Sequence, residues 1–202
     1  MAERADVEPA ERFRPTSGRF TGVLLEVFAA LGLLLAYSDR DQGYALPLAL
    51  GACFVAVLAW AAMLRPGLAL TPTHLVLRNM VETIHVPLAA IETLAVRQVL
   101  AVRAGERRYV SSAVGHSWRR AMKASRQGDR RLTPEQALAQ SYPDYVEARI
   151  RQRCEDARSQ QGVQRGSPEQ LALAEEVRRE PAWLEIGLLS GSGVAFLLVL
   201  LL

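Results

Sequence analysis

The sequence TPTHLVLRNMVETIHVPLAAIETLAVRQVLAVRAGERRYVSS, residues 71–112, decides the fold of this chain. It is rich in Val, Leu, Ile and Thr, in short runs separated by turn-forming residues, which is typical of β-strands. We expect strands over 74–80, 81–86, 91–98, 99–104 and 107–111, with turns near Asn79-Met80, over 88–90 and at Gly105-Glu106. These strands, about five with antiparallel connections, are too few to close a barrel by themselves.

Two apolar blocks precede this β module. Residues 20–37 and 44–64 are each long enough, at about 1.5 Å per residue, to cross roughly 30 Å of hydrocarbon. Only the polar turn SDRDQG at 38–43 separates them, so we expect a helical hairpin. A signal peptide is the competing interpretation of the first block, but Glu26 interrupts its apolar run and a second span follows at once.

A third apolar block, residues 183–202, has Glu185 as its one charged residue. Gly187, Gly191 and Ala195 are spaced by four, a row that allows close approach of another helix. The alternative interpretation is that small residues are simply common in membrane spans.

Glu26 is an ionisable residue inside the first expected span. Such a residue is by default a candidate for function. It could pair with a polar group on another span, or extend towards Arg19 at the membrane surface.

The arginines near the span ends predict the orientation. Arg12, Arg14 and Arg19 precede the first span, Arg65 and Arg78 follow the second, and the connecting turn holds Arg40 between Asp39 and Asp41. Because basic residues favour the cytoplasmic side, we expect the N terminus and the β module in the cytoplasm, the C terminus outside, and the protein in the inner membrane.

Residues 113–181 have a helical character. Thr133 and Ser167 each precede Pro-Glu-Gln, which predicts two N-terminal caps, and Pro143 predicts a break in the first helix. Tyr142, Val146, Ile150 and Cys154 recur every four residues as a buried face, which leaves Glu147, Arg149, Arg151, Arg153 and Glu155 for water. We expect a linker over 160–166 and the end of the last soluble helix at Pro181.

A basic segment runs from Arg103 to Arg131, with nine Lys and Arg against Glu106 and Asp129. We expect it to lie along anionic headgroups, where each cation contributes about 1 kcal/mol. The predicted contact residues are Arg103, Arg107, Arg108, Trp118, Arg119, Arg120 and Lys123. A solvated basic loop is the alternative, and nucleic acid is not an expected partner because no recognition helix or aromatic-rich strand accompanies the charge.

The sequence contains no nucleophile elbow or phosphate-binding loop. If the first hairpin turns on Asn79-Met80, His74 and His85 face each other, but two imidazoles lack the further ligands of a zinc site. Cys53 lies in a span and Cys154 in a charged helix, so we expect no disulfide. We predict no catalytic residues, no metal and no cofactor, and therefore not an enzyme.

Several features in order suggest a family. A Thr-x-x-x-Leu-x-Leu-Arg-Asn strand begins at Thr71, Val86-Pro87 follows, and Ile91 stands four residues after the proline, within PGLALTPTHLVLRN and ETIHVPLAAIETLAV. With DYVEARIRQRCEDAR and AWLEIGLLSGSG further on, the chain from Phe13 to its last span resembles small actinobacterial membrane proteins with a bacterial PH-like (pleckstrin-homology-like) domain. The resemblance implies a seven-stranded, half-open barrel capped by a helix, and no catalytic residues.

The expected architecture is a membrane α + β protein. Its parts are a polar tail (1–19), a transmembrane hairpin (20–64), a cytoplasmic PH-like antiparallel half-barrel (65–128), an extension of amphipathic helices (129–181) and a C-terminal transmembrane helix (182–202). We expect a scaffold or adaptor that engages membrane lipids or a protein. The alternative is an accessory subunit of a membrane enzyme or transporter, and a homo-oligomer is also compatible with the sequence.

Overall fold

The computed structural model describes residues 10–15, 18–115 and 134–201, with the backbone alone over 134–141. The chain forms two compact units. The first, the α+β unit, contains Gly67–Arg78 and Thr83–Arg179 together with the described residues before Gly18. The second, the helical unit, contains Gly18–Pro66, Asn79–Glu82 and Glu180–Leu202.

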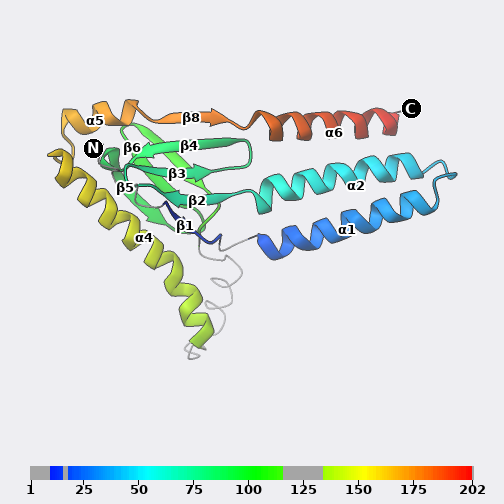
Figure 1. Ribbon diagram of the computed structural model, residues 1–202, viewed down its shortest axis with the longest axis horizontal. Coiled ribbons are helices and arrows are strands. Elements are labelled where there is room, and N and C mark those ends of the chain that lie inside the picture. The colour runs from blue at the N-terminus through cyan, green and yellow to red at the C-terminus, as the bar shows by residue number, and fades with distance from the viewer. Residues whose placement is uncertain (1–9, 16–17, 116–133, 202) are drawn as a thin grey trace, which may run out of the picture. The chain divides into compact units, whose positions relative to one another are not determined.

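Two antiparallel sheets form the framework of the α+β unit (Figure 1). The first has five strands in the order β1-β2-β3-β4-β8: β1 (Glu11–Phe13), β2 (Gly67–Leu70), β3 (His74–Arg78), β4 (Glu82–Pro87) and β8 (Arg178–Pro181). The second has three strands in chain order: β5 (Ile91–Val96), β6 (Leu100–Ala104) and β7 (Arg107–Ser111). The expected tight turn is the 3-10 turn η2 (Leu88–Ala90), which joins β4 to β5.

Alternation along the strands builds the core. Leu68, Leu70, Leu75, Leu77, Ile84 and Val86 are buried from the first sheet, and Val96, Leu100 and Val102 from the second. Burial of each such side chain stabilises the fold by roughly 1.5–3 kcal/mol. The predicted strands are therefore confirmed in kind, with β1, β2 and β8 in addition.

Helix α4 (Pro134–Gln161) packs on this core. Val146, Ile150 and Cys154 are buried as the spacing predicts. The predicted break at Pro143 is wrong, because the helix continues through it. A proline inside a helix removes one hydrogen bond, but the Pro143 ring is fully buried, and this packing offsets the loss.

Helix α5 (Pro168–Glu175) begins at the predicted cap, where the Ser167 hydroxyl accepts a hydrogen bond from the Gln170 amide at 3.3 Å. The second predicted cap, at Thr133, lies outside the described residues. The expectation that a helix reaches Pro181 is wrong. The chain leaves α5 and enters β8, because the edge of β4 offers backbone pairing that no local pattern reveals.

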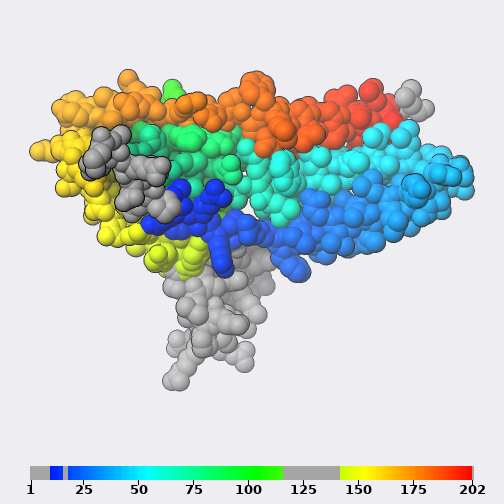
Figure 2. Space-filling view, in the orientation of Figure 1, coloured from blue at the N-terminus to red at the C-terminus, as the bar shows by residue number. Residues whose placement is uncertain are grey.

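The helical unit consists of α1 (Arg19–Ser38), α2 (Ala45–Ala59), which continues into a π-helical turn (Trp60–Leu64), and α6 (Trp183–Leu201). All three predicted spans are present as helices long and apolar enough to cross a membrane. Helix α2 packs against both α1 and α6 (Figure 2). This composition supports a membrane protein.

Contact between α2 and α6 includes residues outside the predicted small-residue row. Phe54 and Phe196 stack with ring centroids 6.3 Å apart, and a Cβ at Gly51 would lie 2.9 Å from the Phe196 ring. At Gly187 and Gly191 a Cβ would meet no described atom within 4 Å. Packing through Gly187, Gly191 and Ala195 thus stays a prediction for contact with another protein.

Candidate functional site

A basic hollow lies on the outer face of the β5-β6-β7 sheet. Its volume is about 340 Å³. It is lined by Thr93, Ala95, Arg97, Val99, Ala101, Val102, Arg103 and Arg108. The lining contains three arginines and no acidic residue, and we refer to it below as the basic hollow.

Strand alternation places the side chains of this lining, other than that of Val102, on one face. Leu100, Val102 and Ala104 of β6 are buried in the core, so the residues between them face outwards. A register irregularity between Ile91 and Thr93 resets the alternation of β5.

The floor of the hollow exists because two small residues face each other. Ala95 of β5 pairs with Ala101 of β6 in the strand register. Their methyl groups leave space where longer side chains would meet across the strands. Arg103 and Arg108 lie towards one end of this floor and Arg97 towards the other, as the register and chain order require.

Arg103 and Arg108 are directly opposite each other on β6 and β7. Like charges in this position repel. Arg103 is partly compensated, since its Nε donates to the Gly105 carbonyl at 3.2 Å and lies 3.9 Å from a carboxylate oxygen of Glu92. No hydrogen bond or ion pair joins the guanidinium groups of Arg97 and Arg108 to any described residue.

The chemistry that suits this arrangement is anion binding. A guanidinium group presents a planar fork of donors that matches phosphate and carboxylate oxygens. Two such groups side by side, above a floor lined by no acidic residue but with Glu92 beside Arg103, form a site for a negatively charged group.

The structure brings together two of the predicted lipid-contact residues, Arg103 and Arg108. Arg107 is exposed but alternates with Arg108, so it belongs to the other face of β7. The remaining predicted contacts, Trp118, Arg119, Arg120 and Lys123, lie outside the described residues. Arg97 was not predicted as a site residue. The alternation Thr93, Ala95, Arg97 in the sequence is the pattern that could have placed it on this face.

The predicted facing of His74 and His85 is wrong. His74 is opposite Pro87 and His85 is opposite Val76, because the turn extends to Glu82, whose carbonyl accepts from the Asn79 amide at 2.8 Å. The histidines are therefore diagonal neighbours. Burial, with a smaller effect of His85, lowers the pKa of His74, and Glu176 opposes this shift. No group of metal-binding residues occurs in the described part of the chain.

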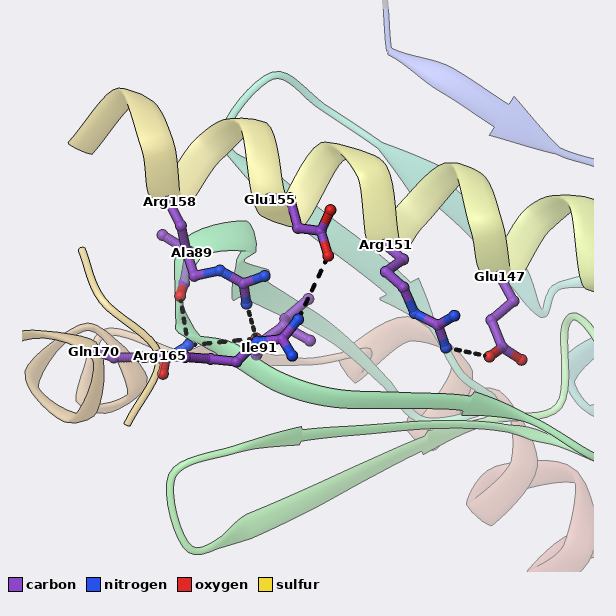
Figure 3. A network of polar contacts seen from close by, with 8 residues as sticks. All are labelled: Ala89, Ile91, Glu147, Arg151, Glu155, Arg158, Arg165 and Gln170. Atoms are coloured by element: carbon purple, nitrogen blue, oxygen red, sulfur yellow. Dashed lines mark hydrogen bonds and ion pairs between the residues drawn. The ribbon is translucent and has the colours of Figure 1, made fainter. Parts of the chain in front are cut away.

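The polar side chains buried in the α+β unit hold its backbone (Figure 3). Arg158 of α4 donates to the Ile91 carbonyl at 2.9 Å. The side-chain nitrogen of Gln170 donates to the Ala89 carbonyl at 3.0 Å, and its side-chain oxygen accepts from the Gly166 backbone amide at 2.7 Å. These contacts fasten turn η2 to α4 and α5, a structural role that the sequence patterns did not predict.

Charged residues of α4 that were expected in water also make contacts. Glu147 accepts a hydrogen bond from the Val96 amide at 2.9 Å and pairs with Arg151 at 2.6 Å. Arg149 binds Glu11 of β1 at 2.5 Å. Cys154 is inert by its surroundings, because burial raises the pKa of its thiol to about 12.

In the helical unit, Arg65 and Glu185 form an ion pair of 2.5 Å between the end of the second candidate span and the start of the third. Arg65 also donates to the carbonyls of Asn79 and Met80. No hydrogen bond or ion pair joins the Glu26 carboxylate to another described residue, so its pairing stays a prediction.

No protein-family model, curated protein or solved structure matches this chain. The class of protein therefore comes from the structure itself. It is a mixed α+β protein with two antiparallel sheets and three helices apolar enough to span a membrane.

Proposed function

We propose that this protein is a non-enzymatic adaptor of the bacterial inner membrane, which presents a cytoplasmic PH-like domain to a protein or to lipid headgroups. The observation that carries the proposal is the basic hollow. Its strands, β5, β6 and β7, lie in the sequence between the second and third candidate spans, so the chain itself tethers the hollow near a membrane.

The fold supports the PH-like part of the proposal. Two antiparallel sheets share one core, and the long helix that follows them packs on that core. A half-open barrel capped by a helix is what the sequence resemblance implies.

The use of buried polar groups supports a non-enzymatic role. Arg158 and Gln170 donate to backbone carbonyls, and the hydroxyl of buried Ser111 accepts from the Ala113 amide at 3.3 Å. Among the described residues, these three buried polar side chains thus stabilise the fold, while the positive charge of the basic hollow lies on the surface. Surface charge of this kind suits recognition.

The cytoplasmic orientation is supported by the distribution of arginine. Arg12 and Arg14 lie before α1, Arg19 is its first residue, and Arg65 and Arg78 lie after the second span. Such a bias places both flanks on the cytoplasmic side.

A second candidate function, an accessory subunit of a membrane enzyme or transporter, is favoured by the exposed face of α6. Gly187 and Gly191 leave open space beside this helix, and small residues allow close packing of a partner helix. Glu26 could then pair with a polar group of that partner.

Extraction of the tagged full-length protein in mild detergent, followed by mass spectrometry of retained proteins and lipids, tests both functions. An adaptor retains a partner or anionic lipid that is lost in the double variant R103Q/R108Q. An accessory subunit retains a membrane protein that is lost in the matched double variant G187L/G191L. Retention of neither a protein nor anionic lipid by the wild-type chain would contradict both.

A further inference from the structure

We propose that the basic hollow binds the phosphate group of an anionic phospholipid headgroup, held between Arg103 and Arg108 with Arg97 at the far end of the floor. This inference rests on the proposed adaptor function and names its ligand. The argument uses the size of the hollow, its charge and the connectivity of the chain.

The size favours a compact ligand. About 340 Å³ is near the lower end of small-molecule sites, which span roughly 300–1,000 Å³. A stable protein partner commonly covers about 800 Å² on each side, and the floor formed by Ala95 and Ala101 is a local depression within a three-stranded sheet. A headgroup fits this space better than a protein surface does.

The charge favours a phosphate. Arg103 and Arg108 are cross-strand partners of like charge, and an anion between them converts their repulsion into two charge-assisted interactions. Arg97 directly follows β5 and is four residues beyond Thr93, which is at most about 13 Å along an extended chain. Its long side chain can reach towards the floor and bind a second oxygen or a second negative group of the headgroup.

Connectivity favours a lipid over a free anion. Strand β2 begins at Gly67, and the second candidate span ends at Leu64. A ligand that resides in the same bilayer as the spans has a high effective concentration at a tethered site. A soluble phosphate compound has no such advantage.

The test uses full-length protein in a nonionic detergent, titrated with phosphatidylglycerol or with phosphatidylcholine of the same acyl chains. Native mass spectrometry reads the number of lipids bound to each protein molecule. We expect one phosphatidylglycerol bound in excess of the lipids that the spans retain, and no matching excess of phosphatidylcholine.

Arginine variants localise the site. R108Q should weaken binding of that lipid about tenfold, the effect of losing one charge-assisted hydrogen bond, and R103Q should weaken it as well. R107Q is the matched control, because it removes the same charge from the neighbouring position of β7 but from the other face. It should leave the affinity unchanged.

A filling variant separates shape from charge. A95L keeps every arginine and occupies the floor, so it should reduce lipid binding as R108Q does. Thermal unfolding of each variant verifies that the α+β unit stays folded, and R97Q provides a second charge variant at the other end of the hollow.

The outcomes separate the inference from the function on which it rests. Equal losses with R107Q and R108Q, unchanged binding with A95L, or displacement of the lipid by inorganic phosphate at the same concentration as the lipid would overturn the assignment of a lipid phosphate to the hollow. If a protein partner is retained and lost with R103Q/R108Q while lipid binding does not change, the adaptor function stands and the inference fails. Absence of both retained partner and lipid defeats both.

Discussion

Glu11 illustrates how a charged residue before the first span becomes part of the α+β unit. It pairs with Leu70 in the β1-β2 ladder, and both of its carboxylate oxygens accept hydrogen bonds from Arg149 of α4. The sequence predicted a polar tail here because ERF carries neither a strand nor a helix period. Only the distant partners, β2 and α4, determine the conformation.

The acid stability of the α+β unit should depend on Glu11. The hydrogen bond and positive charge of Arg149 lower the pKa of Glu11 below 4.5, its ordinary value. Because the pKa is lower in the folded state, the stabilisation is present above that ordinary value and is lost as the pH falls through the folded pKa. E11Q should therefore reduce thermal stability near about pH 7 and have a diminishing effect towards about pH 3.

The measurement is the unfolding temperature of wild-type and E11Q protein across this pH range. R12Q is the control, since Arg12 is an exposed neighbour on the same strand. A difference between wild type and E11Q that does not change with pH would show that the carboxylate charge is not responsible.

At the scale of elements, the sequence predicts the strands and helices that have a periodic pattern of apolar residues. It does not reveal short strands whose pairing partner is distant in the chain. The long strands around residues 74–111 and the four-residue period of α4 follow from their own patterns. Strand β8, RREP, is charged and has four residues, so its pairing with the edge of β4 leaves no local signal. The predicted register of the β3-β4 hairpin is wrong by two positions, because the length of its turn depends on the backbone conformation and leaves no pattern in the sequence.

The site was predicted in part. The basic charge is visible in the sequence, but the hollow depends on Ala95 facing Ala101 across the strands.

Gln170 should determine whether α5 and turn η2 stay joined. It is fully buried and bonds to Ala89 and Gly166, with a longer contact of 3.4 Å to the Ile91 carbonyl. Q170A leaves buried backbone groups without these partners, which costs about 1–3 kcal/mol for each group left unsatisfied. We expect a free energy of unfolding lower by about 2 kcal/mol.

Urea unfolding of the full-length protein in detergent measures this effect, when the unfolding is monitored by a spectroscopic probe in the α+β unit. Q160A is the matched control, because it removes the same side chain from an exposed position near the end of α4. Equal effects of Q170A and Q160A would mean that the buried hydrogen bonds contribute nothing to stability.

At the scale of the molecule, composition predicts the three spans and says little about how they associate. Their length and hydropathy follow directly from the sequence. The stacking of Phe54 on Phe196 requires two residues far apart in the chain. The same holds for the hydrogen bond of 2.8 Å from the Ala182 amide to the Val81 carbonyl, which joins the residues before α6 to the β3-β4 turn within the helical unit.

Arg65 should be the residue on which the association of α2 and α6 depends most. The side chains of Arg65 and Glu185 are each 14% exposed, and breaking a buried ion pair costs about 3–5 kcal/mol when one charge is left behind. Arg65 donates to Glu185 and to two carbonyls, whereas E185Q removes only one of these interactions. R65Q should therefore destabilise the protein by about 3 kcal/mol, more than E185Q does.

Thermal unfolding in detergent of R65Q, E185Q and the double variant gives the coupling between the two residues. R19Q, at an exposed arginine of α1, controls for loss of positive charge. If E185Q proves as damaging as R65Q, the contacts of Arg65 to the β3-β4 turn do not contribute, and the ion pair alone accounts for the effect of Arg65.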